Sequence, residues 1–412
     1  MSISHLQKRI TFHLLLIVTC WVHSKSWAAE FDHEKLDLLR AAMQKYVDNH
    51  TVAGVVAVIG SREGIVASES LGSLNREQRL AMPIDATFRI ASMTKPITAI
   101  AIMMLVDEGR LSVDDPVEKH LAEFKGQLLI ESKEGDRIQL KKPGRAIQIR
   151  DLLSHTSGLP GGFPSGISDL YFRRQLTLGE AVAISSQRPL EFEPGTKWSY
   201  CNAGIDTLGR IVEVVSGIPF EQFLEKRLFL PLGMFDTTFY PNDEQLQRLA
   251  ALYENKDGEL KPTGFQLLGP TKNAKHPIPA GGLYSTAHDL GHLYRMMLTR
   301  GAIGELRLLS EKSVDEMTKI QIGDLSGGFT PGVSMGFGWQ VTRKPEGVHS
   351  MLSAGSFGHG GAFGTQGWID PVQDLFVILL IQRAGMPNAD ASEIRRDLQQ
   401  VAVDALNNEG RH

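Results

Sequence analysis

A serine and a lysine three residues apart form the strongest candidate for chemistry in this sequence. Ser92 and Lys95 lie in segment 88–109, and on a helix an i, i+3 pair shares one face about one turn apart. A serine hydroxyl becomes a good nucleophile when a neighbouring base removes its proton, and a lysine at this spacing supplies that base. The bland alternative is a polar first turn that caps a core helix. The pair therefore predicts a serine nucleophile, provided that other segments support it.

The residues that follow the pair predict a helix buried at the centre of the domain. Segment 97–106 is apolar on every side, as expected of a helix with no solvent face. Pro96 is tolerated in the first turn, where backbone N–H groups have no partner within the helix. Those free N–H groups and the positive end of the helix dipole would stabilise a developing anion beside Ser92.

Size, charge and motif content limit the classes of function. The chain has 412 residues, is 42% hydrophobic and carries a formal net charge of −4. It can bury a large core, and it lacks the excess of positive charge that is typical of proteins that bind nucleic acid. No His-Glu-x-x-His, Cys-x-x-Cys or Walker pattern occurs, so we predict no metal and no cofactor. The sequence does not indicate an oligomeric state.

The first 28 residues are expected to form a signal peptide. Lys8 and Arg9 precede the apolar run 10–22, and small residues at Ser26 and Ala28 suit a cleavage site. The run is too short for an ordinary membrane-spanning helix, so no stable membrane span is expected after removal. Export to the periplasm or the medium is therefore predicted, with a mature chain of 29–412. Cys20 lies in a segment that only loosely resembles a lipoprotein signal.

Apolar periodicity predicts strands at both ends of the chain and helices between them. The segments read as strands are 52–59, 64–71, 337–342, 362–369 and 375–381, with a hairpin at 128–149. The segments read as helices are 31–49, 97–106, 178–186, 202–216, 220–229, 287–297 and 392–406. This order predicts an α/β (α+β) protein: a discontinuous sheet part, about 30–85 and 335–410, holding a helical part, about 86–334. Binding sites favour such a boundary between parts.

A Tyr-x-Asn pattern occurs three times, and one copy is placed to join the site. Tyr200 and Asn202 follow a Pro-Gly turn and open a helix. On their own they would suit a core tyrosine and a helix N-cap. The copies at Tyr240 and Tyr253 lie in polar, loop-like sequence and are predicted to be surface turns.

Two further motifs near the C-terminus are candidates for the active site, and only the second is kept. Ser334 sits in a Gly-x-Ser-x-Gly pattern, but a nucleophile elbow needs a strand before the serine and a helix after it. Here a strand is expected to follow, so Ser334 is rejected as the nucleophile. His359, Gly360 and Gly361 enter a strand-like run, where glycines let the backbone approach a ligand closely. The alternative is a tight turn with a surface histidine.

Together these pieces resemble the serine β-lactamase and penicillin-binding-protein superfamily, in its class C-like branch. That branch includes β-lactamases, D-alanyl-D-alanine peptidases, D-aminopeptidases and carboxylesterases. The matching segments follow the family's order over nearly the whole mature chain: 88–95, 108–117, 152–159, 193–202, 231–234, 280–289, 336–339 and 359–361. The resemblance implies an antiparallel sheet flanked by helices, an all-helical subdomain, and an active site between them.

The resemblance also implies roles for individual residues. Ser92 corresponds to the acyl-accepting nucleophile and Lys95 to its proton-transfer partner. Tyr200 corresponds to the general base, and Asn202 to the residue that orients Lys95 and contacts substrate. The oxyanion hole would consist of the backbone N–H groups of Ser92 and Ala362.

The third motif departs from the family pattern. Where β-lactamases carry Lys-Thr-Gly or Lys-Ser-Gly, this chain has His359, Gly360 and Gly361. A histidine with an ordinary pKa of about 6.5 is mostly neutral at pH 7 and is expected to offer one N–H donor, whereas lysine carries a fixed charge. The site therefore looks better suited to neutral esters or amides than to anionic β-lactams.

The sequence as a whole predicts an exported serine hydrolase that works through an acyl-enzyme and is esterase-like. The substrate would be a small ester or amide. Two alternatives stay open within the hydrolases: a β-lactamase, or a peptidase acting on D-amino-acid or cell-wall peptides, in which His359 would be the polar anchor. A third alternative is a non-catalytic peptidoglycan-binding module. Such a module would not need Ser92, Lys95, Tyr200 and Asn202 together.

Overall fold

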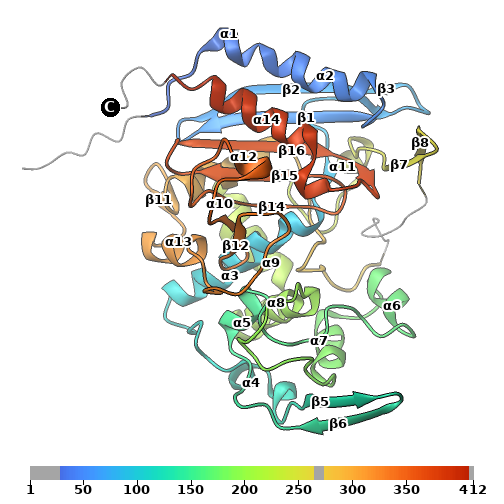
Figure 1. The fold of residues 1–412 in the computed structure, drawn as a ribbon, viewed down its shortest axis with the longest axis vertical. Coiled ribbons are helices and arrows are strands. Elements are labelled where there is room, and N and C mark those ends of the chain that lie inside the picture. Colours follow the sequence, from blue (N-terminus) through green and yellow to red (C-terminus); the bar gives the residue numbers. More distant parts are fainter. Residues whose placement is uncertain (1–27, 264–272, 408–412) are drawn as a thin grey trace, which may run out of the picture.

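A computed structural model describes residues 28–263 and 273–407 of the chain. The expected signal peptide, 1–28, lies outside the described residues except for its last one. An eight-stranded antiparallel sheet forms the upper half of the molecule in Figure 1, and a group of helices forms the lower half. The α+β architecture expected from the order of elements is therefore present.

The sheet combines strands from the two ends of the chain. Its strand order is β12-β13-β14-β15-β16-β1-β2-β3. The bounds are β1 Gly54–Ser61, β2 Gly64–Asn75, β3 Leu80–Ala81, β12 Val333–Met335, β13 Gln340–Thr342, β14 Phe357–Gly360, β15 Gln366–Asp370 and β16 Leu375–Ile381. The register pairs β1 with β16 from Val55 opposite Ile381 to Gly60 opposite Phe376. Strands from the N-terminal and C-terminal segments thus lie in the same sheet, and the helical part is formed by the residues between them in the sequence.

Alternating side chains of β1 supply both faces of the sheet. Val55, Ala57 and Ile59 pack into a core that includes residues of α2 (Leu38–Asp48) and α14 (Glu393–Asp404). Val56 and Val58 point the other way, into the larger core that continues into the helical part. The two-residue period of a strand produces this division. Helix α12 (Ala287–Leu298) packs on the sheet, although residues 287–298 fall in the range expected for the helical part.

The helical part is built around α3 (Thr94–Asp107), which is buried over nearly its whole length. It packs against α8 (Asn202–Ser216), and α8 in turn contacts α5 (Ile149–Leu153) and α7 (Leu178–Ser186). A helix that is apolar all round needs neighbours on every side, and those of α3 include α8 and α13 (Glu311–Thr318). The remaining helices are α1 His33–Leu36, α4 Val117–His120, α6 Ser168–Phe172, α9 Phe220–Leu224, α10 Leu230–Leu232 and α11 Asp243–Gln247, with a π-helical segment Glu225–Phe229 after α9.

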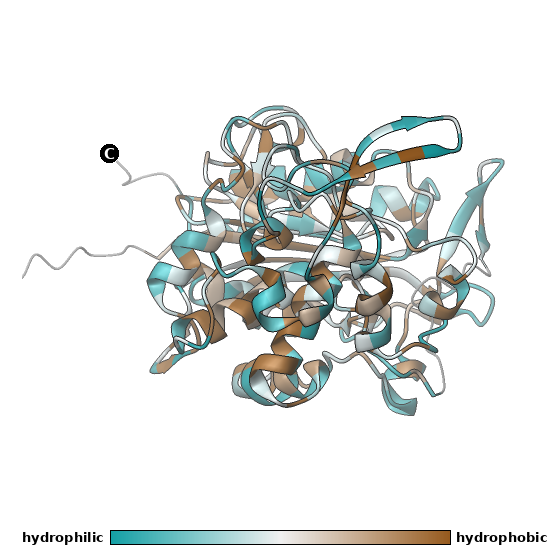
Figure 2. Ribbon diagram, turned by 90° about the horizontal axis from the view of Figure 1, so that it is seen from below, coloured by the Kyte–Doolittle hydropathy of each residue, from teal (hydrophilic) through white to brown (hydrophobic). Residues whose placement is uncertain are grey.

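Shorter strands complete the described chain. The hairpin expected within 128–149 is β5 (Leu129–Glu134) and β6 (Arg137–Lys141); it projects at the bottom of Figure 1 and is mostly hydrophilic in Figure 2. The other short strands are β4 Phe88–Arg89, β7 Tyr253–Lys256, β8 Glu259–Pro262, β9 Tyr284–Ser285, β10 Ala302–Ile303, β11 Leu306–Arg307 and β17 Arg383–Ala384. The pairing of β4 with β9 brings residues 88–89 beside 284–285, directly ahead of Ser92.

Three predictions about local structure are wrong. The strand expected at 337–342 begins only at Gln340, after bends at residues 337–339. The strand expected at 362–369 begins only at Gln366, because Gly361 donates to the Thr365 carbonyl and closes a turn, with Gly364 at φ +83°. Tyr253 is not in a surface turn. It is fully buried in β7, and its hydroxyl donates to Glu77 at 2.6 Å. The polar residues that surround it in the sequence did not indicate that this ring belongs to the core.

The interpretation of Ser334 agrees with the structure. It lies in β12, which pairs with β13 in an antiparallel hairpin, and its side chain is 2% exposed. The segment therefore lacks the strand–serine–helix arrangement of a nucleophile elbow.

Candidate active site

Ser92 and Lys95 meet at the start of the central helix. Ser92 lies in the 3₁₀ turn Ala91–Met93, and Lys95 lies in the first turn of α3. Lys95 Nζ donates to Ser92 Oγ at 3.0 Å and to the Ala280 carbonyl at 2.6 Å. Burial lowers the pKa of Lys95 to about 7. Near neutral pH a large share of this amine is unprotonated and can accept a proton from the serine.

The backbone immediately before Ser92 adopts an unusual conformation. Ala91 has φ +47°, in the left-handed region that side chains with a Cβ rarely occupy. The Ile90 N–H donates to the Leu283 carbonyl at 3.1 Å, and the Thr94 hydroxyl donates to the Ala91 carbonyl at 2.7 Å. These bonds hold the strained residue in place, so that partly exposed Ser92 projects beside Lys95.

Tyr200 lies next to the serine–lysine pair. The Lys95 ammonium nitrogen is 4.7 Å from the centre of the Tyr200 ring. Desolvation holds the pKa of the Tyr200 hydroxyl above its usual range, although a hydrogen bond with Ser92 partly opposes this shift. The phenol is therefore protonated at neutral pH, and the group with a pKa near neutrality is Lys95. The site brings Ser92, Lys95 and Tyr200 together.

A buried histidine that the sequence reading left unused positions Tyr200. The ring of His155 lies 4.6 Å from that of Tyr200, and its Nδ1 accepts the Cys201 N–H at 3.2 Å. The His155 carbonyl also accepts the Ser199 N–H at 2.9 Å. His155 thus binds the backbone on both sides of Tyr200. Burial and the nearby charge of Lys95 hold its pKa well below the usual value, so the ring is neutral.

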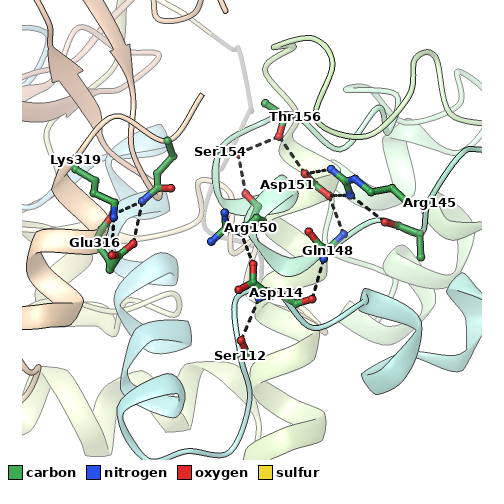
Figure 3. Close-up of polar contacts among 12 residues, drawn as sticks. Ser112, Asp114, Arg145, Gln148, Arg150, Asp151, Ser154, Thr156, Glu316 and Lys319 are labelled. Carbon is green, nitrogen blue, oxygen red and sulfur yellow. Dashed lines mark hydrogen bonds and ion pairs between the residues drawn. The ribbon is translucent and has the colours of Figure 1, made fainter. Parts of the chain in front are cut away.

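The turn that carries His155 is fixed by a buried carboxylate. Asp151 is 2% exposed and accepts two hydrogen bonds from the Arg145 guanidinium, at 2.6 and 2.8 Å, and one from the Gln148 N–H at 2.8 Å. Its backbone carbonyl accepts the Thr156 N–H at 2.8 Å, and Ser154 Oγ lies 3.0 Å from Thr156 Oγ1. Figure 3 shows this network around Asp151. The motif at 152–159 is therefore a rigid support for the tyrosine.

The glycine motif lies beside the serine turn. Gly361 packs so closely on Ile90 that a Cβ there would lie 2.5 Å from the Ile90 carbonyl oxygen. Thr365 Oγ1 donates to the same carbonyl at 3.3 Å. In the part of the chain that the structure describes, the N–H groups of Ser92 and Ala362 donate to no backbone carbonyl. Both are available for the oxyanion that the resemblance assigns to them.

His359 is a buried neutral side chain in β14. It is 1% exposed, and burial together with the charge of Lys95 lowers its pKa to about 3. Its Nδ1 lies 2.7 Å from the Gly360 carbonyl oxygen. The expected ordinary pKa near 6.5 is wrong, because the strand buries the ring. The alternative of a tight turn with a surface histidine is wrong for the same reason.

Among the described residues, no hydrogen bond joins Asn202 to Lys95. Asn202 is exposed at the first position of α8, and its side chain makes no hydrogen bond to any described residue. The N-cap of this helix is Cys201, whose sulfur accepts the Gly204 N–H at 3.3 Å. The second partner of the lysine is the Ala280 carbonyl instead.

Sequence reasoning also missed Asp206, which lies one turn further along α8. Its carboxylate accepts the Ala280 N–H at 2.9 Å and the hydroxyl of Tyr171, and it is 3% exposed. Burial raises the pKa of Asp206 to about 6, while Lys95 opposes this shift. The only signal in the sequence was a charged residue within an apolar helical face.

No group of three or more potential metal ligands occurs among residues 28–263 and 273–407. Within these residues, no helix is both long and apolar enough to span a bilayer.

Comparison with known proteins connects this geometry to a family. The sequence profile of the Beta-lactamase family matches residues 39–402. The chain belongs to the beta-lactamase family. Protein Rv1367c of Mycobacterium tuberculosis (strain ATCC 25618 / H37Rv) is 33% identical over 378 residues, 87% of this chain and 92% of that protein. Esterase EstB of Burkholderia gladioli is 29% identical over 375 residues, 84% of this chain and 90% of EstB.

Solved structures confirm the fold. EstCE1, described as a hydrolase with promiscuous acyltransferase activity, matches with a TM-score of 0.75 and 24% identity, over 90% of this chain and 99% of EstCE1. A penicillin-binding protein homologue from Caulobacter crescentus matches with a TM-score of 0.73 and 20% identity, over 92% of this chain and all of that one. The protein is thus a class C-like serine hydrolase of the beta-lactamase family, as its motifs predicted.

Proposed function

We propose that this serine hydrolase cleaves neutral carboxylic esters or amides through an acyl-enzyme on Ser92. The 3.0 Å contact between Lys95 Nζ and Ser92 Oγ carries the proposal. It places a buried amine with a pKa of about 7 on a partly exposed hydroxyl. A base of that pKa accepts a proton efficiently at neutral pH.

Acylation follows from the positions of these groups. Ser92 Oγ bonds to the substrate carbonyl carbon as its proton passes to neutral Lys95, and the carbonyl oxygen becomes an oxyanion. The N–H groups of Ser92 and Ala362 stabilise that oxyanion; one such donor is typically worth about 3–4 kcal/mol of barrier. When the bond to the alkoxy oxygen breaks, that oxygen takes the Tyr200 hydroxyl proton, and Lys95 returns a proton to Tyr200.

Deacylation repeats these steps with water in place of the serine. The water oxygen bonds to the acyl carbon, and its proton passes through Tyr200 to Lys95. The bond to Ser92 Oγ then breaks, and Oγ recovers a proton from Lys95. In this scheme Tyr200 relays protons while Lys95 is the resident base, because the phenol is protonated at rest and the amine has the pKa nearer neutrality.

The third motif supports esters over β-lactams. The side chain at the position of the family's lysine is the neutral, buried His359, and Gly360 provides no hydroxyl. A substrate carboxylate would find no cation there, and losing a charge-assisted hydrogen bond is costly. The name of the relative EstB, an esterase, is consistent with this preference.

We also propose that the mature enzyme is exported, to the periplasm or the medium. Ala29, the expected first residue after cleavage, already belongs to the fold, since its N–H donates to Asp374 at 2.9 Å. After cleavage the new terminal ammonium would face that carboxylate. N-terminal sequencing of protein recovered from the periplasm and the medium tests the proposal; a start at Met1 would contradict it.

The activity is tested with p-nitrophenyl butyrate and a fluorophosphonate probe. Wild type and Ser334→Ala should hydrolyse the ester and become labelled, whereas Ser92→Ala should do neither. Mass spectrometry of a slowly deacylated ester should place the acyl group on Ser92. Labelling that persists in Ser92→Ala would contradict the proposal.

A further inference from the structure

The hydrogen bond of His359 fixes which ring nitrogen carries the proton. Its Nδ1 lies 2.7 Å from the Gly360 carbonyl oxygen, which can only accept. The proton of a neutral ring must therefore sit on Nδ1. The remaining nitrogen, Nε2, then presents a lone pair. The sequence-based expectation that His359 offers an N–H donor to substrate is wrong, because its one N–H is already used.

That lone pair is buried and unmatched. Among the described residues, His359 Nε2 has no hydrogen-bond partner and is shielded from solvent. A buried polar atom without a partner is costly, so such an atom calls for an explanation. The charge of Lys95 acts on the ring, and the ring of Tyr200 is 6.3 Å away, so Nε2 lies close to the reacting groups.

Besides Lys95, aromatic side chains surround His359. Phe329 is 42% exposed and packs edge-on against Tyr200, with ring centroids 4.9 Å apart, and lies 6.5 Å from His359. The ring centroid of Trp198 lies 5.8 Å from that of Phe329. A group that reaches Nε2 therefore passes these aromatic rings before it meets the lone pair.

Building on the proposed ester hydrolysis, we infer that His359 Nε2 accepts a hydrogen bond from the substrate, so that the preferred acyl group carries a hydroxyl or an amide N–H. An apolar chain with one donor matches the aromatic surface and the lone pair together. A substrate carboxylate cannot form a hydrogen bond with Nε2, because both groups are acceptors. Its negative charge would also have no cationic partner at His359. A site built to pair with a polar group discriminates against analogues that lack it.

The test compares p-nitrophenyl esters of three acyl groups of similar length: 3-hydroxybutyrate, butyrate and hemisuccinate. In wild type, kcat/KM for the hydroxy ester should exceed that for butyrate, and hemisuccinate should be the poorest. His359→Phe keeps a flat ring but removes the acceptor, so the hydroxy-to-butyrate ratio should fall about fivefold to tenfold. His288→Phe, which changes an exposed histidine, should leave the ratio at the wild-type value.

The tautomer is tested directly by ¹⁵N NMR of histidine-labelled wild type, which does not depend on the variant folding. A protonated Nδ1 and a bare Nε2 on His359 are expected; a protonated Nε2 would overturn the inference. An unchanged ratio in His359→Phe, or a preference for hemisuccinate, would also overturn it. If wild type hydrolyses none of the three esters, the proposed esterase function fails instead.

Discussion

Lys95 and Asp206 are joined through a single backbone residue. Lys95 Nζ donates to the Ala280 carbonyl at 2.6 Å, and the Ala280 N–H donates to the Asp206 carboxylate at 2.9 Å. The two charged side chains are buried and come from different helices, α3 and α8. The negative charge of Asp206 raises the pKa of Lys95 against the larger lowering by burial. Asp206 therefore acts as a positioning residue that also sets how basic the lysine is.

Replacing Asp206 by Asn should move the acid limb of the pH–rate profile to lower pH. Removing the negative charge lowers the pKa of Lys95 further below about 7, so the amine stays unprotonated in more acidic solution. The weaker base should also lower kcat at pH 8. Both effects are measured from kcat against pH with p-nitrophenyl butyrate.

Tyr171→Phe is the matched comparison, because it removes the other hydrogen bond of Asp206 and leaves the carboxyl group in place. That hydrogen bond lowers the pKa of Asp206, so its loss removes only part of the negative charge near neutral pH, and the acid limb should move less far than in Asp206→Asn. An Asp206→Asn variant with an unshifted acid limb would mean that the carboxylate only supports the fold.

Lys95→Ala and Tyr200→Phe should each reduce kcat about 10²- to 10⁴-fold, the usual contribution of a positioned proton-transfer group. Because both residues act on protons in the transition state, KM should change much less than kcat. Tyr240→Phe is the control, since Tyr240 is 38% exposed and belongs to the rejected Tyr-x-Asn copy. Circular dichroism should show all three variants folded. An equal loss in Tyr240→Phe would show that Tyr200 was the wrong choice.

The sequence predicted the elements whose periodicity is strong and whose interactions are local. The helices 178–186 and 202–216 and the strand 375–381 have the same bounds in the structure. The contact of Ser92 with Lys95 follows from three residues of spacing on one turn. By contrast, the strand start at Gln366 depends on a turn closed between Gly361 and Thr365, which no apolar pattern records.

The rest of the site depends on contacts between distant segments. Asp206 reaches Lys95 only through Ala280, a residue 74 positions further along the chain. His155 contacts Tyr200 from a turn that Asp151 fixes. The pKa of His359 is lowered by burial in a strand, so its residue type alone predicted the wrong protonation behaviour. These features arise from tertiary packing, which single-segment patterns do not encode.

The free energy of unfolding should fall as the pH is lowered from 7 towards 4. His349, His276 and His359 are buried, and their pKa values are lowered to about 2, 4 and 3. The unfolded chain, with a histidine pKa near 6.5, binds these protons first, so acid favours unfolding. Each histidine contributes about 1.4 kcal/mol per pH unit below 6.5 until its folded pKa is reached. Asp206 has the opposite effect, because its raised pKa lets the folded protein bind a proton before the unfolded chain does. One such carboxyl does not offset three buried histidines.

Urea unfolding at several pH values measures this slope. His349→Gln should reduce the slope by roughly one histidine's share, because it removes one of these buried bases. His288→Gln should not change it, since the side chain of His288 is exposed. A free energy of unfolding that stays constant between pH 7 and 5 would contradict the assignment of neutral buried histidines.

His359→Lys should shift the substrate preference towards anions. The new ammonium restores the cation of the family pattern, and a bound carboxylate would favour its charged form despite burial. A hydrogen bond to a charged group is worth about 1.5–3 kcal/mol, so the kcat/KM ratio of nitrocefin to p-nitrophenyl butyrate should rise about tenfold or more. Introducing Thr at 360 as well is unsuitable, because a Cβ there would lie 2.3 Å from side-chain atoms of Gln366 and Asp390.

His359→Met separates the effect of charge from that of size, because it offers a flexible side chain without a cation; its ratio should stay low. Lowering the pH from 8 to 6 is a second control in wild type. A histidine with an ordinary pKa would become charged over this range and raise the ratio, but the pKa of about 3 keeps His359 neutral throughout. The wild-type ratio should therefore be flat with pH. If it rises towards pH 6, or if wild type already prefers nitrocefin to the ester, a neutral His359 does not determine the charge preference.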